Sequence, residues 1–136
     1  MTYEEWEEQV SPEIKKGAVW KFYGYRKALF LHDLVWADCE YWQKERRGWS
    51  IIDQVMRSAG SISANIEEGC GRGFGRDNAR FLKIAVGSAR ETQGWYWRGR
   101  KLLPPDVYQH RMAWLDEIIA LLVTEISRQL NYTPDR

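Results

Sequence analysis

Residues 57–101 read RSAGSISANIEEGCGRGFGRDNARFLKIAVGSARETQGWYWRGRK, and this stretch predicts two helices joined by a glycine-rich turn at residues 70–75. Small residues crowd both predicted helices: Ala59, Gly60, Ser61, Ser63 and Ala64 before the turn, and Ala85, Gly87, Ser88 and Ala89 after it. Glycine inside a helix costs roughly 1 kcal/mol relative to alanine. We therefore expect Gly60, Gly87, Gly94 and Gly99 to allow close approach of the backbone to another helix or to a ligand.

Apolar residues spaced three and four apart predict further helices on both sides of this stretch. The expected helices cover residues 2–9, 19–42, 49–68, 76–103 and 105–130, with Gly69 as the C-terminal cap of the helix at 49–68. Short connections between four long helices favour antiparallel neighbours. The sequence thus predicts an all-α, up-down-up-down antiparallel four-helix bundle over residues 19–131. An acidic N-terminal extension with a short helix covers residues 1–18, and a tail covers residues 132–136.

Each long helix carries an apolar stripe that we expect to form the core. The stripes consist of Phe22, Tyr25, Leu29, Val35 and Trp36 in the first; Ile52, Val55, Met56, Ala59, Ile62, Ser63 and Ile66 in the second; Phe81, Ala85, Ala89, Thr92, Tyr96 and Leu103 in the third; and Val107, Trp114, Leu115, Ile118, Leu121, Leu122, Ile126 and Leu130 in the fourth.

The composition is that of an ordinary globular domain of 136 residues, with 44% hydrophobic and 29% charged residues. No apolar run approaches the ~18 residues that a membrane helix needs. The acidic start MTYEEWEEQV lacks the basic and apolar regions of a signal peptide, so we expect a cytoplasmic protein. Cys39 and Cys70 match no metal-ligand spacing and are expected to be free thiols.

Charge is distributed unevenly, although the net charge is only +1. Residues 1–13 hold five glutamates and no basic residue, whereas residues 71–101 hold eight basic and two acidic residues. This asymmetry indicates a partner or a neighbouring subunit. Eight tryptophans also favour partly buried surfaces such as interfaces.

The run RSAGSISANIEEGCGR, followed by RFLKIAVGSARE, resembles the four-helix-bundle proteins encoded in intervening sequences of bacterial 23S rRNA genes, also labelled S23 ribosomal protein. That family in turn resembles the accessory variability determinant proteins of diversity-generating retroelements. The family pattern falls here on Arg57, Ser61, Ile62, Asn65, Ile66, Glu68, Gly69, Arg72, Phe81, Leu82, Gly87, Ser88 and Glu91.

The resemblance implies the bundle fold and a ring-like homopentamer. For the retroelement relatives it also implies a basic surface that binds nucleic acid and a reverse transcriptase. This chain departs from that pattern in its acidic, tryptophan-bearing N-terminal extension and in its nearly neutral charge, since those relatives are strongly basic.

A basic stripe is the main candidate binding feature. On a helical wheel, Arg76, Arg80, Lys83, Arg90, Arg98 and Lys101 lie within ~40° of one line, which also passes through Gly87 and Gly94. Such spacing suits a phosphate backbone, and the aromatic rings of GWYWRGRK could stack on bases. With Arg72, these residues are our candidate nucleic-acid-binding set. The alternative is a solvated outer face, with the aromatic residues in a subunit interface.

The polar and small motif residues are expected to be structural: Arg57, Ser61, Asn65, Glu68, Gly69, Gly87, Ser88 and Glu91. The alternative is a catalytic pair of carboxylates, Glu68 and Glu91. The glycines of the turn lack the preceding strand of a phosphate-binding loop, and His32 and His110 lack metal-ligand spacing. We therefore expect no catalytic residue, metal or cofactor.

The sequence favours a non-enzymatic, homo-oligomeric accessory or scaffold protein whose partners are RNA, DNA, a reverse transcriptase or another protein. Oligomerisation would multiply weak contacts of the basic stripe. The alternative is a purely protein–protein module, in which the acidic N-terminal segment docks on a basic neighbour.

Overall fold

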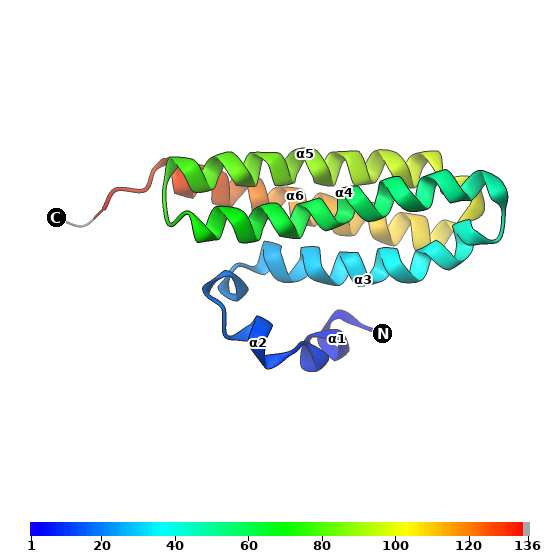
Figure 1. Ribbon diagram of the computed structural model, residues 1–136, viewed down its shortest axis with the longest axis horizontal. Helices are drawn as coiled ribbons and strands as arrows, with labels where there is room; N and C mark the ends of the chain where they lie inside the picture. Colours follow the sequence, from blue (N-terminus) through cyan, green and yellow to red (C-terminus); the bar gives the residue numbers. More distant parts are fainter. Residues whose placement is uncertain (135–136) are drawn as a thin grey trace.

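Helices make up nearly all of the computed structural model, which describes residues 1–134 (Figure 1). The elements are α1 (Tyr3–Gln9), α2 (Pro12–Lys15), the 3-10 helix η1 (Ala18–Lys21), α3 (Tyr23–Gln43), α4 (Arg46–Gly71), α5 (Arg76–Arg98), the 3-10 helix η2 (Arg100–Leu102) and α6 (Pro105–Leu130). Within residues 1–134 there is no strand, so the all-α prediction is confirmed. Of the predicted tail, residues 135–136 lie outside the described part of the chain.

The four long helices lie side by side, and each packs against two of the others (Figure 1). The helix α4 contacts α3 and α5, while α6 contacts α5 and α3. The short helices α1 and α2 lie along the outer side of α3. None of the helices in the described chain is long and apolar enough to cross a lipid bilayer.

Several predicted helix boundaries are wrong, each for a local reason. The helix α3 begins at Tyr23 instead of Val19 because residues 18–21 form a 3-10 turn and Phe22 is extended. Gly69 is not a cap, since α4 continues to Gly71. Gly73 and Gly75 instead make the turn, with φ of 85° and 108°. The helix α5 ends at Arg98, so Lys101 lies in η2 and not on α5.

Gly69 has a packing role inside α4. A Cβ atom at this position would lie 2.9 Å from Asn78 Oδ1 and 3.1 Å from the Asn78 backbone oxygen. The absence of a side chain therefore lets α4 approach the first turn of α5.

The predicted apolar stripes form most of the core. Fully or nearly fully buried members include Val55, Ala59, Ile62, Ile66, Ala85, Ala89, Tyr96, Leu115, Ile118 and Leu122. Two members do not belong to it, because Trp36 and Leu130 are 69% and 49% exposed. Both side chains lie on the solvent-facing side of their helices within the described structure.

The N-terminal segment packs into the same core. Trp6 and Trp20 are buried, and Trp6 lies against Phe30 of α3 with ring centroids 5.3 Å apart. Phe30 in turn contacts the ring of Trp114 in α6, at 5.3 Å. An ion pair between Arg26 and Glu7, 2.8 Å long, adds a polar tie to α3.

Trp42 joins the α3–α4 turn to the end of α5. Its ring is completely buried, and its Nε1–H donates a 3.0 Å hydrogen bond to the carbonyl of Gly99. A Cβ atom at Gly99 would overlap this indole, and one at Gly48 would overlap the Trp42 backbone. The α3–α4 turn and the end of α5 therefore meet at one end of the molecule. This contact requires glycine at position 48, next to the Trp42 backbone, and at position 99, next to its indole ring.

Gly99→Ala is expected to lower the free energy of unfolding by about 1–3 kcal/mol, because the added methyl group overlaps the Trp42 ring. The matched control is Gly87→Ala, where the new methyl group would meet no other part of the described chain within 4 Å. That control should raise stability by about 1 kcal/mol through helix propensity. Urea denaturation of both variants provides the measurement, and equal effects would contradict this account of Trp42.

Candidate functional site

The basic stripe faces away from the core. Arg76, Arg80, Lys83, Arg90 and Arg98 are exposed on α5, whereas Arg72 caps α4 and Lys101 belongs to η2, both also exposed. Gly87 lies in the middle of this face, and nothing lies within 4 Å of the position of its missing Cβ. The expected close approach at Gly87 is therefore not to any of residues 1–134, and the residue itself is exposed.

Two stripe residues are partly neutralised by neighbouring carboxylates. Arg72 pairs with Glu68 at 2.9 Å, and Arg80 pairs with Asp77 at 3.1 Å. Arg98 lies over the Trp95 ring, 4.7 Å from its centroid. Among the described residues, Arg76, Lys83, Arg90, Arg98 and Lys101 form no ion pair, so unpaired charge lies along the whole stripe.

A second group of basic residues continues the stripe at the end of α5. The contact between Trp42 and Gly99 brings Lys44, Arg46 and Arg47 to the same end of the molecule as Arg98, Arg100 and Lys101. We call these six residues the basic end. The α3–α4 connection also contains one carboxylate, that of Glu45, which pairs with Arg47.

Two exposed tryptophans lie at the basic end. Trp97 is 53% exposed, and the Arg100 guanidinium lies 3.6 Å from its ring centroid. Trp49 is 56% exposed, and its Nε1–H donates to the carbonyl of Gln43 at 3.1 Å. Trp97 also contacts Tyr108, with ring centroids 6.4 Å apart. Both tryptophans thus have local contacts and remain more than half exposed.

Sequence reasoning missed half of this surface. Residues 44–48 lie between two predicted helices and are predicted only as a connection. Together with Trp49 they read KERRGW, three basic residues beside an aromatic ring, which is similar to WRGRK at residues 97–101. The two runs are far apart in sequence, so their proximity could not be inferred without the Trp42 contact.

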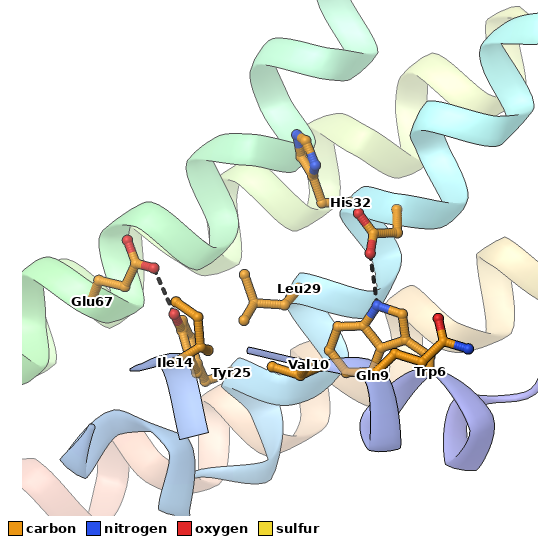
Figure 2. A pocket seen from close by; sticks show the side chains of 9 residues that line it. Trp6, Gln9, Val10, Ile14, Tyr25, Leu29, His32 and Glu67 are labelled. Carbon is orange, nitrogen blue, oxygen red and sulfur yellow. Dashed lines mark hydrogen bonds between the residues drawn. The ribbon is translucent and has the colours of Figure 1, made fainter. Parts of the chain in front are cut away.

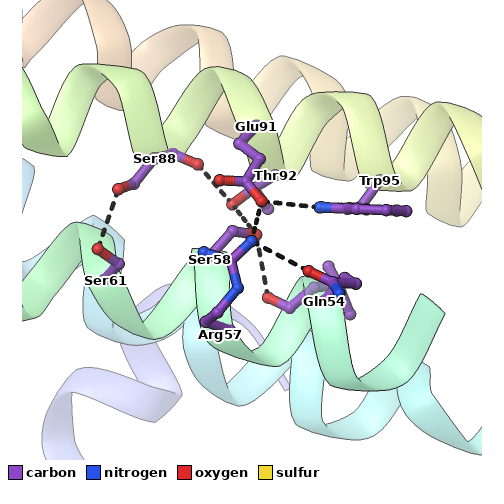
Figure 3. A network of polar contacts seen from close by, with 9 residues as sticks. Gln54, Arg57, Ser58, Ser61, Ser88, Glu91, Thr92 and Trp95 are labelled. Atoms are coloured by element: carbon purple, nitrogen blue, oxygen red, sulfur yellow. Dashed lines mark hydrogen bonds and ion pairs between the residues drawn. The ribbon is translucent and has the colours of Figure 1, made fainter. Parts of the chain in front are cut away.

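The motif residues lie between α4 and α5 (Figure 3). Ser88 Oγ donates to Ser61 Oγ at 3.0 Å, and Thr92 Oγ1 lies 2.9 Å from Ser58 Oγ and 2.8 Å from the Ser88 carbonyl. These short hydroxyl groups satisfy one another across the interface, which allows the two helices to pack closely.

Glu91 forms the outer edge of this network. It accepts a 3.0 Å hydrogen bond from Trp95 Nε1 and pairs with Arg57 (Figure 3). The Trp95 N–H bond and the Arg57 charge hold the pKa of Glu91 below its usual value. Glu91 is therefore a carboxylate that ties α5 to α4.

The remaining motif residues have separate local contacts. Asn65 donates to the Ser61 carbonyl at 2.8 Å, and Glu68 pairs with Arg72. Glu68 lies eleven residues after Arg57, the partner of Glu91, which is ~16 Å along α4. The structure does not bring Glu68 and Glu91 together, so the alternative of paired catalytic carboxylates is not formed.

A buried ionic cluster was also missed from the sequence. Asp38 is only 1% exposed and accepts from Arg111 Nε and Nη2 at 2.8 and 3.0 Å. Tyr96 donates to the same carboxylate at 2.6 Å, and burial together with the Asp38 charge raises the pKa of Tyr96 well above its usual value. The cluster joins α3, α5 and α6, and its partners satisfy each other.

The histidines and cysteines have no shared site. The His110 ring stacks on Trp114, and burial lowers the pKa of His110, whereas His32 lies beside Gly60. Cys39 and Cys70 are both free thiols, as expected. No group of three metal-ligating side chains occurs among residues 1–134.

A model of the family described as 23S rRNA-intervening sequence protein matches residues 21–124. Among solved structures, the chain is similar to a protein with unknown function from the S23 ribosomal protein family of Bacteroides thetaiotaomicron VPI-5482, determined by crystallography at 1.70 Å. The two are 25% identical with a TM-score of 0.69, and the match covers 76% of this chain and 97% of that chain. No curated protein matches the sequence. Residues 1–20, which include α1 and α2, lie outside the family match.

Thr92→Val is expected to lower the free energy of unfolding by about 1–2 kcal/mol, because an isosteric methyl group removes the buried hydrogen bonds to Ser58 and the Ser88 carbonyl. Thr124→Val, at an exposed position of α6, is the matched control and should change stability by less than about 0.5 kcal/mol. Chemical denaturation measures both. If Thr92→Val leaves the free energy of unfolding unchanged, the hydroxyl network does not hold α4 and α5 together.

Proposed function

Because this chain belongs to the 23S rRNA-intervening sequence protein family, we propose that it is a non-enzymatic, oligomeric helical module that binds single-stranded nucleic acid. The binding surface would consist of the outer face of α5 and the basic end. The observation that carries this proposal is the meeting of two separate basic runs, each beside an exposed tryptophan, at the end of the α5 stripe.

The architecture we propose is an up-down-up-down bundle of α3, α4, α5 and α6 over residues 19–131, with residues 1–18 as an extension. Support comes from the short connections at Lys44–Glu45, Arg72–Gly75 and Gly99–Pro104. Connections of this length favour antiparallel neighbours.

The spacing of the stripe suits a phosphate backbone. From Arg76, the next basic residues on α5 follow at steps of four, three and seven residues, which correspond to ~6, ~4.5 and ~10.5 Å along the helix. Gly87 falls within the step of seven residues, and its missing side chain leaves room for a phosphate backbone to approach between Lys83 and Arg90. Binding at such a surface would be electrostatic and therefore sensitive to salt.

The exposed rings favour a single strand over a duplex. Bases of a single strand can stack on aromatic side chains, and stacking adds about 1–3 kcal/mol per base. Trp97 and Trp49 lie next to the basic residues that would hold the phosphates. A duplex would offer those rings no free base.

Oligomerisation would raise the affinity of this surface by repeating it. Exposed apolar side chains on other faces, Trp36, Ile84 and Val123, could be buried between subunits. The family resemblance favours a pentamer. The retroelement resemblance adds a reverse transcriptase in the cytoplasm as the protein partner that we propose.

A purely protein–protein module is the second candidate. Glu4, Glu5 and Glu8 are exposed on α1, so the acidic helix of one copy could dock on the basic α5 of a neighbour. In that arrangement the stripe would be covered by protein and would not bind nucleic acid.

The double variant Lys83→Gln/Arg90→Gln is expected to weaken binding to a mixed-sequence single-stranded oligonucleotide. Removing two phosphate contacts should reduce the slope of log K against log salt by about 1.4. Lys16→Gln/Arg128→Gln removes the same charge from exposed positions elsewhere and is the control. Fluorescence anisotropy over a salt series gives both slopes, and unchanged affinity for the first variant would favour the protein–protein module.

Trp97→Ala is expected to weaken oligonucleotide binding by about 1–3 kcal/mol, since one stacked base loses its platform. Tyr23→Ala removes an aromatic ring of similar exposure from α3, 58% against 53%, which also lies under an arginine, and should leave binding unchanged. Anisotropy titrations at one salt concentration compare the two. If the control loses as much affinity as Trp97→Ala, stacking at the basic end is not the source of binding.

A further inference from the structure

A cavity of about 330 Å³ lies where the N-terminal segment meets α3 and α4 (Figure 2). Trp6 and Val10 line it from the N-terminal side, and Leu29 of α3 lines it between two carboxylates. Trp6 itself is buried, so this wall is a packed part of the molecule. The N-terminal wall belongs to residues outside the family match.

Two carboxylates line the cavity, Asp33 and Glu67, both exposed to solvent. The imidazole of His32 also lines it, and none of the lining residues is lysine or arginine (Figure 2). Neither carboxylate forms an ion pair with any residue in the described range 1–134. Because a carboxylate can accept several hydrogen bonds, each retains acceptor capacity toward the cavity.

Both carboxylates are held by aromatic donors. The Trp6 Nε1–H donates to Asp33 Oδ2 at 2.7 Å, and the Tyr25 hydroxyl donates to Glu67 Oε2 at 2.6 Å (Figure 2). These donors are neutral, so they fix the position of each carboxylate without cancelling its charge. A cation that entered would meet two anchored anions.

The separation of the anchors indicates the shape of the ligand. Tyr25, Leu29 and Asp33 follow one another at four-residue steps on one face of α3. The positions that hold the two carboxylates are therefore ~12 Å apart along the helix. One metal ion cannot bridge that span, whereas a chain with an amino group at each end can, with its methylene groups against Leu29 and Val10.

We propose that this cavity binds a linear aliphatic diamine or polyamine, with one ammonium group on Asp33 and another on Glu67. The site is separate from the stripe and the basic end, and it does not depend on nucleic-acid binding. Isosteric amides provide selective variants. In Asp33→Asn and Glu67→Gln a carbonyl oxygen can still accept from Trp6 or Tyr25, so the walls stay in place while the charge is lost.

The test is a titration of the full-length protein with spermidine in the absence of nucleic acid, followed by NMR of the Trp6 indole N–H. We expect a saturable shift of that resonance, and an apparent Kd about tenfold higher in each of the two variants. Glu68→Gln, which changes the adjacent carboxylate outside the cavity, should leave the Kd within about twofold. Circular dichroism checks that all variants are folded.

Three results would overturn the proposal. They are the absence of a saturable shift, an equal loss of affinity in Glu68→Gln, and binding of n-butylamine as tight as that of spermidine. The last result would mean that one anchor suffices and that the two carboxylates do not act together. Because no oligonucleotide is present, none of these outcomes bears on the proposed function.

Discussion

The burial of the Trp42 indole against Gly99 is the contact on which the shape of the molecule depends. A completely buried indole needs a partner for its N–H group, and the Gly99 carbonyl supplies it across 57 positions of sequence. Glycine at positions 48 and 99 makes room for the ring and for the backbone behind it. As a consequence, the α3–α4 turn and the end of α5 meet, and the basic residues of both segments lie at one end of the molecule.

Small side chains allow α4 and α5 to approach closely. The opposite side of α5 is exposed and carries the basic stripe. Gly69 and the serine hydroxyls let the two backbones come near while leaving no buried side-chain polar atom without a partner within the described chain. At Gly87, by contrast, an added Cβ would meet no other part of the described chain within 4 Å. Glycine there weakens the helix by roughly 1 kcal/mol, and no packing contact within the described residues accounts for it.

The N-terminal segment adds a second layer to the family's matched region. Its aromatic residues bury themselves against Phe30 and Trp114, which fixes α1 on the outside of α3. Where this layer meets α3 and α4, packing is incomplete, and a cavity with two carboxylates remains. By contrast, the buried Asp38 cluster is closed, because Arg111 and Tyr96 saturate the carboxylate. Asp38 is buried and paired with Arg111, whereas the two carboxylates of the cavity have no basic partner among residues 1–134. This difference separates the structural cluster from the proposed ligand site.

The sequence by itself determined the helical class, the approximate extent of the long helices, most core residues and the family motif, because apolar periodicity and small-residue runs are local signals. It also located the exposed stripe on α5, since one helix face can be read from one stretch. Helix ends were less accurate: Gly69 was read as a cap, although its lack of a side chain serves packing against Asn78. Only the tertiary structure decided which glycine is buried and which is open, that Glu68 and Glu91 lie apart, and that Lys44–Arg47 joins Arg98–Lys101. Periodicity shows which face of a helix is apolar, but the neighbour that covers that face is selected by long-range packing.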